Sequence, residues 1–248
     1  MALFISHLYS QNFAPATIIS TVSAVAYMHK INNCADPTSA FVIKKILHGA
    51  NKLGTVPDKR LPITKDILIR LYNSVNHICT SHYSRLLFRS MYVIAFFAFL
   101  RVGEFTGSSP NVLLLDQIIL NANNNFSIVF KNFKHHKGNP ITMIIQPSTF
   151  PCPVKTLKEY LALRGSFPGP LFCYPQSKAI TRECFSHHLN LSLTWAGLSD
   201  QHYKSHSFRI GAATHAAALG YSDAQIQAMG RWKSSAFRKY IRLPTVTM

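Results

Sequence analysis

Residues 206–220 read HSFRIGAATHAAALG, residues 230–232 read GRW, and residues 239–244 read KYIRLP. His206 and Arg209 are three positions apart at the start of a predicted helix, so their side chains share one face of that helix. The first turn of a helix also presents unpaired backbone N–H groups, which suit an anion. This stretch therefore predicts a site for a negatively charged group.

A further arginine follows the most apolar run of the chain. Residues 99–104 read FLRVGE, which places Arg101 directly after the apolar run Met91–Leu100. Taken singly, each of these arginines is more often an ordinary surface residue, and the histidine is more often part of a core. The order along the chain is more specific, because an arginine is followed by His-x-x-Arg, then by a tryptophan and a tyrosine.

The charge balance indicates a polyanionic partner. The 248 residues include 26 Lys and Arg but only nine Asp and Glu, which gives a formal net charge of +17. The chain has 48% hydrophobic residues, which disfavours intrinsic disorder. The positive charge favours nucleic acid over a membrane surface as the partner. The acidic residues are scattered without a close pair, which disfavours a metal-dependent phosphoryl-transfer enzyme. We expect no cofactor and no metal site.

Cysteine usage and the N-terminus predict an intracellular, soluble protein. The five cysteines are odd in number and form no Cys-x-x-Cys pair, which argues against both a disulfide framework and a zinc site. The N-terminal sequence does not resemble a signal peptide. The apolar run Met91–Leu100 is shorter than the ~20 residues that a membrane-spanning helix needs, so we expect a buried helix there.

Apolar spacing predicts a mainly α chain with a small β-hairpin or sheet, an α+β fold. In the first part of the chain, one helix is predicted to begin at Pro15, a second to cover 39–52, a third to follow an N-cap at Thr64, and a fourth to cover 84–100. In the second part, one helix runs from Thr181 to Gly197 and another ends at Gly220. A further helix runs from a capping box at Ser222 and Gln225 to Gly230, and the last covers 235–242. The hairpin is predicted from Phe126–Lys131 and Ile141–Ile145, with a brief strand at Leu171–Tyr174. Segment 54–62 is the best linker.

The ordered set of an arginine, His-x-x-Arg, a tryptophan and a tyrosine resembles the tyrosine recombinase (phage-integrase-like) family. The local sequence is most similar to that of recombinases of eukaryotic mobile elements, the DIRS/Ngaro and Crypton kinds. The resemblance implies a helical, SAM-like core-binding domain over 1–57, which is short for such a domain, and a tyrosine recombinase catalytic domain over 58–248. It also implies a site-specific recombinase of a mobile element that cuts and rejoins DNA through a 3′-phosphotyrosine intermediate.

The resemblance carries particular roles onto this chain. Tyr240 would attack the scissile phosphate, Arg101 and Arg209 would clamp its nonbridging oxygens, and His206 would assist proton transfer. Trp232 stands where many relatives have a second histidine, and its indole N–H can donate to phosphate but cannot act as a base.

Two further roles depend on the hairpin and on an acid. The catalytic lysine of the family lies on a hairpin, where this chain offers Lys131, Lys134 and Lys137, and we choose Lys134. Glu104 would be the structural acid that orients Arg101.

The remaining basic residues are expected to contact the DNA backbone, although a merely solvated face would look the same. They are Lys44, Lys45, Lys52, Lys59, Arg60, Lys131 and Lys137. The implied partners are double-stranded DNA and further copies of the chain, as a dimer or tetramer, with nuclear localisation if the element is eukaryotic. A catalytically silent DNA-binding descendant and a type IB topoisomerase remain as alternatives.

Overall fold

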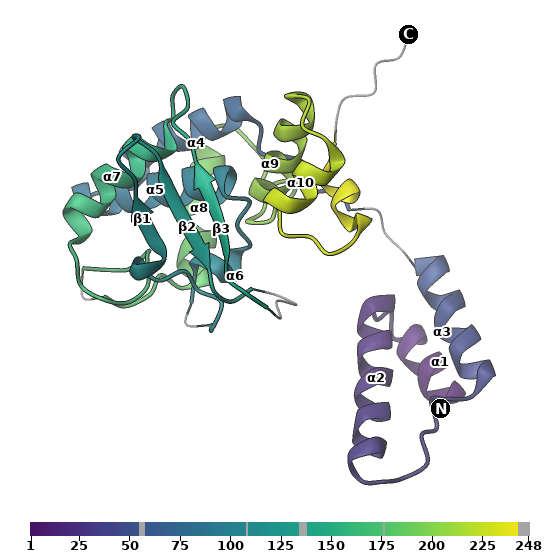
Figure 1. The fold of residues 1–248 in the computed structure, drawn as a ribbon. Helices are drawn as coiled ribbons and strands as arrows, with labels where there is room; N and C mark the ends of the chain where they lie inside the picture. The colour runs from purple at the N-terminus through teal and green to yellow at the C-terminus, as the bar shows by residue number, and fades with distance from the viewer. Residues whose placement is uncertain (55–57, 108, 134–137, 176, 243–248) are drawn as a thin grey trace. The chain divides into compact units, whose positions relative to one another are not determined.

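The computed structural model describes residues 1–54, 58–107, 109–133, 138–175 and 177–242. The chain forms two compact units, Met1–Lys59 and Arg60–Met248 (Figure 1). Lys134 and Lys137 lie outside the described residues. Within the described residues, no helix combines the length and the apolar character that crossing a membrane requires.

The N-terminal unit consists of three helices. They are α1 (Ala2–Ser10), α2 (Pro15–Ile31) and α3 (Phe41–Gly54). Pro15 occupies the first turn of α2, where its missing N–H costs no hydrogen bond, as the sequence predicts. The unit has a small core, in which Ile5, Ile18, Val22 and Ile43 are buried.

The second unit is built around α5 (His82–Phe97), whose residues from Leu86 onward are almost all buried. Three more long helices surround it: α4 (Lys65–Ile78), α7 (Pro153–Arg164) and α8 (Arg182–Trp195). Thr64 and Thr181 cap α4 and α8 by accepting the backbone N–H of Ile67 and Cys184, which confirms both predicted helix starts.

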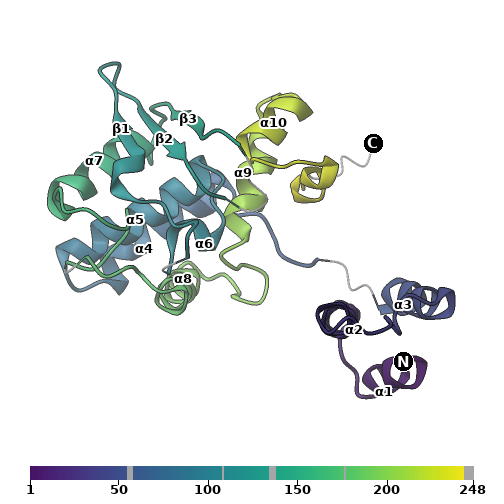
Figure 2. The ribbon, with the colours of Figure 1, turned by 60° about the horizontal axis from the view of Figure 1, so that its bottom comes forward.

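One face of this helical group is covered by an antiparallel sheet in the order β1 (Ile118–Leu120), β2 (Phe126–Phe130) and β3 (Ile141–Ile145). Phe126 pairs with Ile145 and Phe130 with Ile141, which confirms the predicted hairpin. In Figure 2 the sheet and α8 lie on opposite sides of α5. Buried side chains of β2 join the main core, so the sheet is held by apolar packing.

One predicted element is wrong in type, and another is a helix of a different kind from its neighbours. The expected strand at 171–174 is only an isolated bridge between Cys173 and Ala179. The helix expected over 235–242 is present as a 3-10 helix, η2 (Ser235–Tyr240), which ends at the tyrosine. Its neighbours are α9 (Ser207–Ala218) and α10 (Asp223–Met229), and α10 begins with the predicted Ser222–Gln225 capping box.

The C-terminal elements pack around a second small core. Phe99, Ala213, Ile226 and Phe237 are buried there, with Trp232 and Tyr240 packed against them. Two shorter helices complete the unit, α6 (Val102–Phe105) and η1 (Leu115–Gln117). Together these elements confirm a mainly helical fold with one small sheet.

Candidate active site

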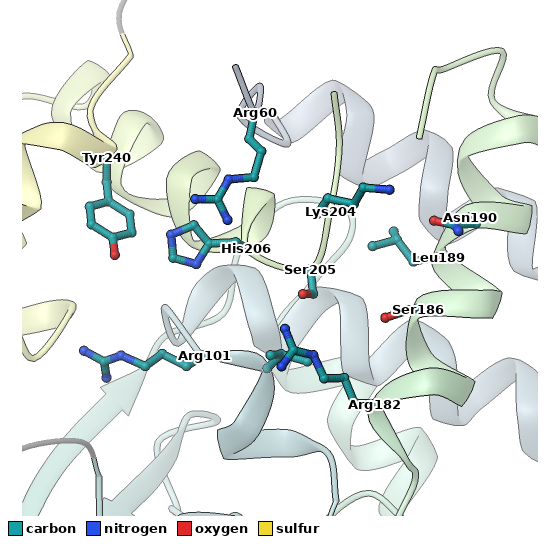
Figure 3. Close-up of a pocket in the computed structure, with 11 residues that line it drawn as sticks. Arg60, Arg101, Arg182, Ser186, Leu189, Asn190, Lys204, Ser205, His206 and Tyr240 are labelled. Carbon is teal, nitrogen blue, oxygen red and sulfur yellow. The ribbon is translucent and has the colours of Figure 1, made fainter. Parts of the chain in front are cut away.

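A cavity of about 470 Å³ opens in the second unit, between segments that are far apart in the sequence. Figure 3 shows the side chains around it. Its lining residues are Arg60, Arg101, Val102, Arg182, Ser186, Leu189, Asn190, Lys204, Ser205, His206 and Tyr240. Three arginines and a lysine share this wall with a histidine and a tyrosine, so the cavity suits an anionic group.

Tyr240 reaches the cavity from the end of η2. Its backbone carbonyl accepts a hydrogen bond from Thr214 Oγ1 at 3.1 Å, and the same Oγ1 accepts the N–H of Arg242 at 3.0 Å. Thr214 lies on α9, so this helix fixes the segment that carries the phenol. The phenol ring lies between His206 and Trp232, with both ring-centroid distances at 5.0 Å.

Arg101 enters the cavity from the loop that precedes α6. Its Nη1 donates to Glu104 Oε1 at 2.9 Å, and its backbone N–H donates to Glu104 Oε2 at 2.9 Å. The Arg101 side chain is 25% exposed, whereas that of Glu104 is 3% exposed. Glu104 therefore holds the arginine from the protein side and leaves part of its guanidinium facing the cavity.

Arg209 does not line the cavity. It is fully buried, and its Nη1 and Nη2 donate to the backbone carbonyls of Phe99 and Gly230. The guanidinium carbon lies 4.1 Å from the ring centroid of Trp232 and 5.9 Å from that of Tyr240. Burial, followed by the charges of neighbouring arginines, holds the pKa of Arg209 below its ordinary value. Arg209 thus places a positive charge directly behind the two rings.

Trp232 covers Gly230 closely. A Cβ atom built on Gly230 would lie 1.5 Å from Cζ3 of the indole, so only glycine lets the ring take this position. The indole Nε1–H is buried and has no hydrogen-bond partner among the described residues. It is therefore a donor with unused capacity beside Tyr240.

Sequence reasoning missed Arg231, which lies inside the quoted GRW triplet. Its side chain is 0% exposed, and its Nη2 donates to Glu104 Oε2 at 2.7 Å. Arg182 and Lys204 were also missed, although both line the cavity. The capped start of α8 could have drawn attention to Arg182, but no local pattern indicates the Arg231–Glu104 pair.

The lysines that were predicted to contact DNA and that the structure describes lie on the surface. Lys131 donates to Asp116 Oδ2 at 2.6 Å on the exposed surface. Lys44, Lys45, Lys52 and Lys59 are exposed on the N-terminal unit. Among the residues that the structure describes, no group of three or more His, Cys, Asp or Glu could hold a metal ion.

Comparison with known proteins places the fold. No family model matches the sequence, and neither does any curated protein. The structure matches that of the XerH site-specific recombinase bound to a palindromic difH substrate, with a TM-score of 0.58 and 21% identity over 75% of this chain. It matches a lambda integrase dimer bound to a COC′ core site, with a TM-score of 0.65 and 14% identity over 97% of this chain and 63% of that one.

A third match is the Tn1549 transposon integrase in complex with circular intermediate DNA, with a TM-score of 0.64 and 12% identity over 98% of this chain and 80% of that one. The fold is that of tyrosine recombinases. This chain spans 50% of the length of the XerH chain that it matches.

The cavity combines a hydroxyl, an imidazole and positive charge. Tyr240 offers a hydroxyl nucleophile, and His206 lies beside its ring as a group that can accept a proton. Arg101 at the wall and Arg209 behind it place positive charge beside the phenol of Tyr240.

Proposed function

We propose that this protein is a site-specific DNA recombinase that cuts and rejoins DNA strands through a 3′-phosphotyrosine intermediate. One observation carries the proposal: Tyr240, His206 and Arg101 come from three distant segments and line one cationic cavity. The tyrosine recombinase fold supports it, and so do the solved structures with this fold, which are described as recombinases or integrases bound to DNA.

In the proposed reaction, Tyr240 Oη attacks the phosphorus of one DNA strand. The bond to the 5′ oxygen breaks, a phosphotyrosyl bond to the 3′ end forms, and a free 5′-hydroxyl is released. His206 takes the phenolic proton, and Lys134 delivers a proton to the departing 5′ oxygen. Because the bond energy is kept in the phosphotyrosyl ester, the reverse attack by a 5′-hydroxyl rejoins the strand without another energy source.

The arginines and the tryptophan have different tasks in this proposal. Arg101 contacts a nonbridging oxygen directly, because part of its guanidinium faces the cavity. Arg209 stabilises the charge from behind, and a direct contact with the phosphate requires the Trp232 indole to move aside. The same movement would expose the buried, unpartnered Nε1–H of Trp232 as a further donor for the phosphate.

The basic residues outside the cavity belong to the same proposal. We propose that residues 1–57 form a core-binding domain that contacts the DNA backbone through Lys44, Lys45 and Lys52. The catalytic domain begins at 58, and Lys59 at its start contacts the backbone as well. Copies of the chain would assemble on double-stranded DNA as a dimer or tetramer. The sequence segments GRW and KYIRLP support an origin in a eukaryotic mobile element, which would place the protein in the nucleus.

Adduct formation tests the function. The full chain is incubated with a pool of nicked duplexes whose sequence around the nick is randomised, and the products are separated in a denaturing gel. We expect a protein–DNA adduct that survives denaturation, forms undiminished in EDTA, and disappears in Tyr240→Phe. Tyr221→Phe is the matched control, because Tyr221 is exposed and does not line the cavity.

The same assay separates the alternatives. A silent DNA-binding descendant would bind duplex DNA and form no adduct. A type IB topoisomerase would relax a supercoiled plasmid without sequence preference. Adduct formation that persists in Tyr240→Phe, or that EDTA abolishes, would contradict the proposed mechanism.

A further inference from the structure

We propose that Arg231 is a positioning residue for Arg101, acting through the carboxylate of Glu104. The inference rests on the proposed function, because it names a residue that sets up the phosphate-binding arginine of that site. Arg231 itself does not line the cavity. Its role is therefore to hold and tune a group that does.

The three side chains form a continuous ion-paired array. Glu104 Oε1 accepts from Arg101 Nη1 at 2.9 Å, and Glu104 Oε2 accepts from Arg231 Nη2 at 2.7 Å. The same Oε2 also accepts the backbone N–H of Arg101 at 2.9 Å. Both carboxylate oxygens are thus engaged, one by each guanidinium, and the carboxylate cannot rotate without breaking a bond to Arg101.

Charge counting explains why a second arginine is useful. A pair of Arg101 and Glu104 alone has no net charge, so its attraction for a phosphate would be weak. Adding Arg231 gives the array one net positive charge. Since Arg231 and Glu104 are buried and only Arg101 is partly exposed, that charge acts at the cavity through Arg101.

Arg231 is itself held in place from several sides. Its guanidinium carbon lies 3.7 Å from the ring centroid of Phe130, the last residue of β2. Its Nη1 donates to the carbonyl of Ala98 at 3.2 Å. Its backbone has a left-handed φ of 54°, which is unusual for a residue with a side chain. Arg231 therefore links β2, the segment before Arg101 and the segment that carries Trp232.

A mere packing role would not need this charge. Replacing a buried ion pair by apolar residues of similar size is often neutral or stabilising. Desolvating Arg231 carries a cost, and its Nε lacks a hydrogen-bond partner among the described residues. Arg231 keeps its charge at this cost and shares the Glu104 carboxylate with Arg101. A positioning role accounts for that charge.

A double-mutant cycle tests the inference. Adduct formation is timed in a single turnover for the full-length protein, Arg231→Met, Arg101→Ala and the double variant, on a nicked duplex that the wild-type protein cleaves. We expect Arg231→Met to slow adduct formation about 10- to 100-fold, the usual effect of losing an outer partner of a site residue. In the Arg101→Ala background the same change should cause no further loss.

A purely structural role gives a different result. It would lower the rate by the same factor in both backgrounds, which would overturn the proposal. Arg231→Lys keeps the charge and should recover most of the lost rate. If Arg231→Met fails to fold, Glu104→Gln/Arg231→Met leaves no unpaired buried charge, and it should fold and remain slow. A wild-type rate in that variant would also contradict the proposal.

A measurement without cleavage separates this inference from the proposed function. The guanidinium Nε–H signal of Arg101, assigned with Arg101→Lys, is recorded by 15N NMR. We expect Arg231→Met to shift and broaden this signal and to leave that of Arg182 unchanged. An unmoved Arg101 signal would refute the positioning role, whereas a wild-type protein that never forms an adduct would refute the proposed function alone.

Discussion

The imidazole of His206 and the phenol of Tyr240 lie next to each other, with ring centroids 5.0 Å apart and ring planes tilted by 54°. A single helix sets this distance, because His206 is the N-cap residue of α9 and Thr214 of the same helix donates to the Tyr240 carbonyl. The proposed nucleophile and its proton acceptor therefore belong to one chain.

Replacing His206 by asparagine should slow adduct formation about 10²- to 10⁴-fold, the range typical of general acid–base catalysis. Binding to duplex DNA should change little, because one side chain is a small part of the cationic surface. The measurement is single-turnover adduct formation together with a binding titration. His215→Asn is the control, since His215 packs beside Phe96 and does not line the cavity. An unchanged rate in His206→Asn would remove His206 from the mechanism.

Among the hairpin lysines, Lys134→Ala should slow cleavage with little loss of DNA affinity. A lysine that protonates the departing 5′ oxygen contributes to rate rather than to binding. Lys131→Ala is the comparison, because Lys131 is ion-paired to Asp116 on the surface and should keep its cleavage rate. The assignment to Lys134 is wrong if Lys131→Ala or Lys137→Ala shows the loss instead.

The salt dependence of DNA affinity should show whether Arg182 and Lys204, the two cavity residues that sequence reasoning missed, contact phosphates. Each lysine or arginine that neutralises a phosphate contributes about 0.9 to the slope of log affinity against log salt concentration. Arg182→Ala and Lys204→Ala should each reduce the slope by about that amount. Lys155→Ala should leave it unchanged, since Lys155 is exposed on α7 and does not line the cavity. A slope near zero for the wild-type protein would contradict DNA binding altogether.

Glu104 should make stability depend on pH in the acid range. Burial alone would raise the pKa of Glu104, but the charge of Arg231, the backbone N–H of Arg101 and the charge of Arg101 outweigh it and hold the pKa below its usual value. A lowered folded-state pKa stabilises the protein above the unfolded pKa, and this stabilisation is lost as pH falls through the folded pKa.

Urea unfolding of Glu104→Gln and the wild-type protein between pH 3 and 7 measures this effect. At pH 7 the substitution should cost about 3–5 kcal/mol, because it leaves Arg231 buried without its charged partner. The difference in unfolding free energy should shrink as the pH is lowered. A difference that stays constant over this range would show that folding does not lower the pKa of Glu104. Glu159→Gln, at a more exposed ion pair, is the control.

Gly230→Ala should displace the Trp232 indole from the position that it occupies against Gly230. The added Cβ would overlap the ring, whereas the backbone at Gly230, with φ of −82°, accepts alanine without strain. We expect adduct formation to fall at least tenfold (about 1.4 kcal/mol), with duplex affinity retained. Gly49→Ala is the matched control, since nothing lies within 4 Å of its added Cβ. A wild-type rate in Gly230→Ala would show that the indole position is unimportant.

Local signals in the sequence predict much of the fold. The caps at Thr64, Thr181 and Ser222 are satisfied within three residues, so the chain needs no distant contact to reveal them. β1 has three residues, too few for an alternating pattern to stand out. The final segment ends in a 3-10 helix at Tyr240, and its backbone is tied to Thr214, a contact that local spacing does not indicate.

The sequence identifies candidate site residues where a motif carries them in order, and it misses residues whose pairing is long-range. Arg101, His206 and Tyr240 line one cavity, as their order along the chain suggests. Arg231 pairs with a carboxylate 127 residues away, and no local pattern encodes such a contact. The deep position of Arg209 also depends on carbonyls from two other segments, so its burial could not be inferred from the His-x-x-Arg spacing.

Phe99 has a left-handed backbone, with φ of 52°, and its carbonyl oxygen accepts from both Arg209 and Arg231. One main-chain atom thus anchors the arginine behind the tyrosine and the arginine behind Glu104. A scan that replaces side chains one at a time leaves this acceptor in place, so it would score position 99 only by the packing of its ring. The anchoring depends on the direction of a peptide group, and an amide-to-ester exchange in the backbone is the kind of chemistry that would reach it.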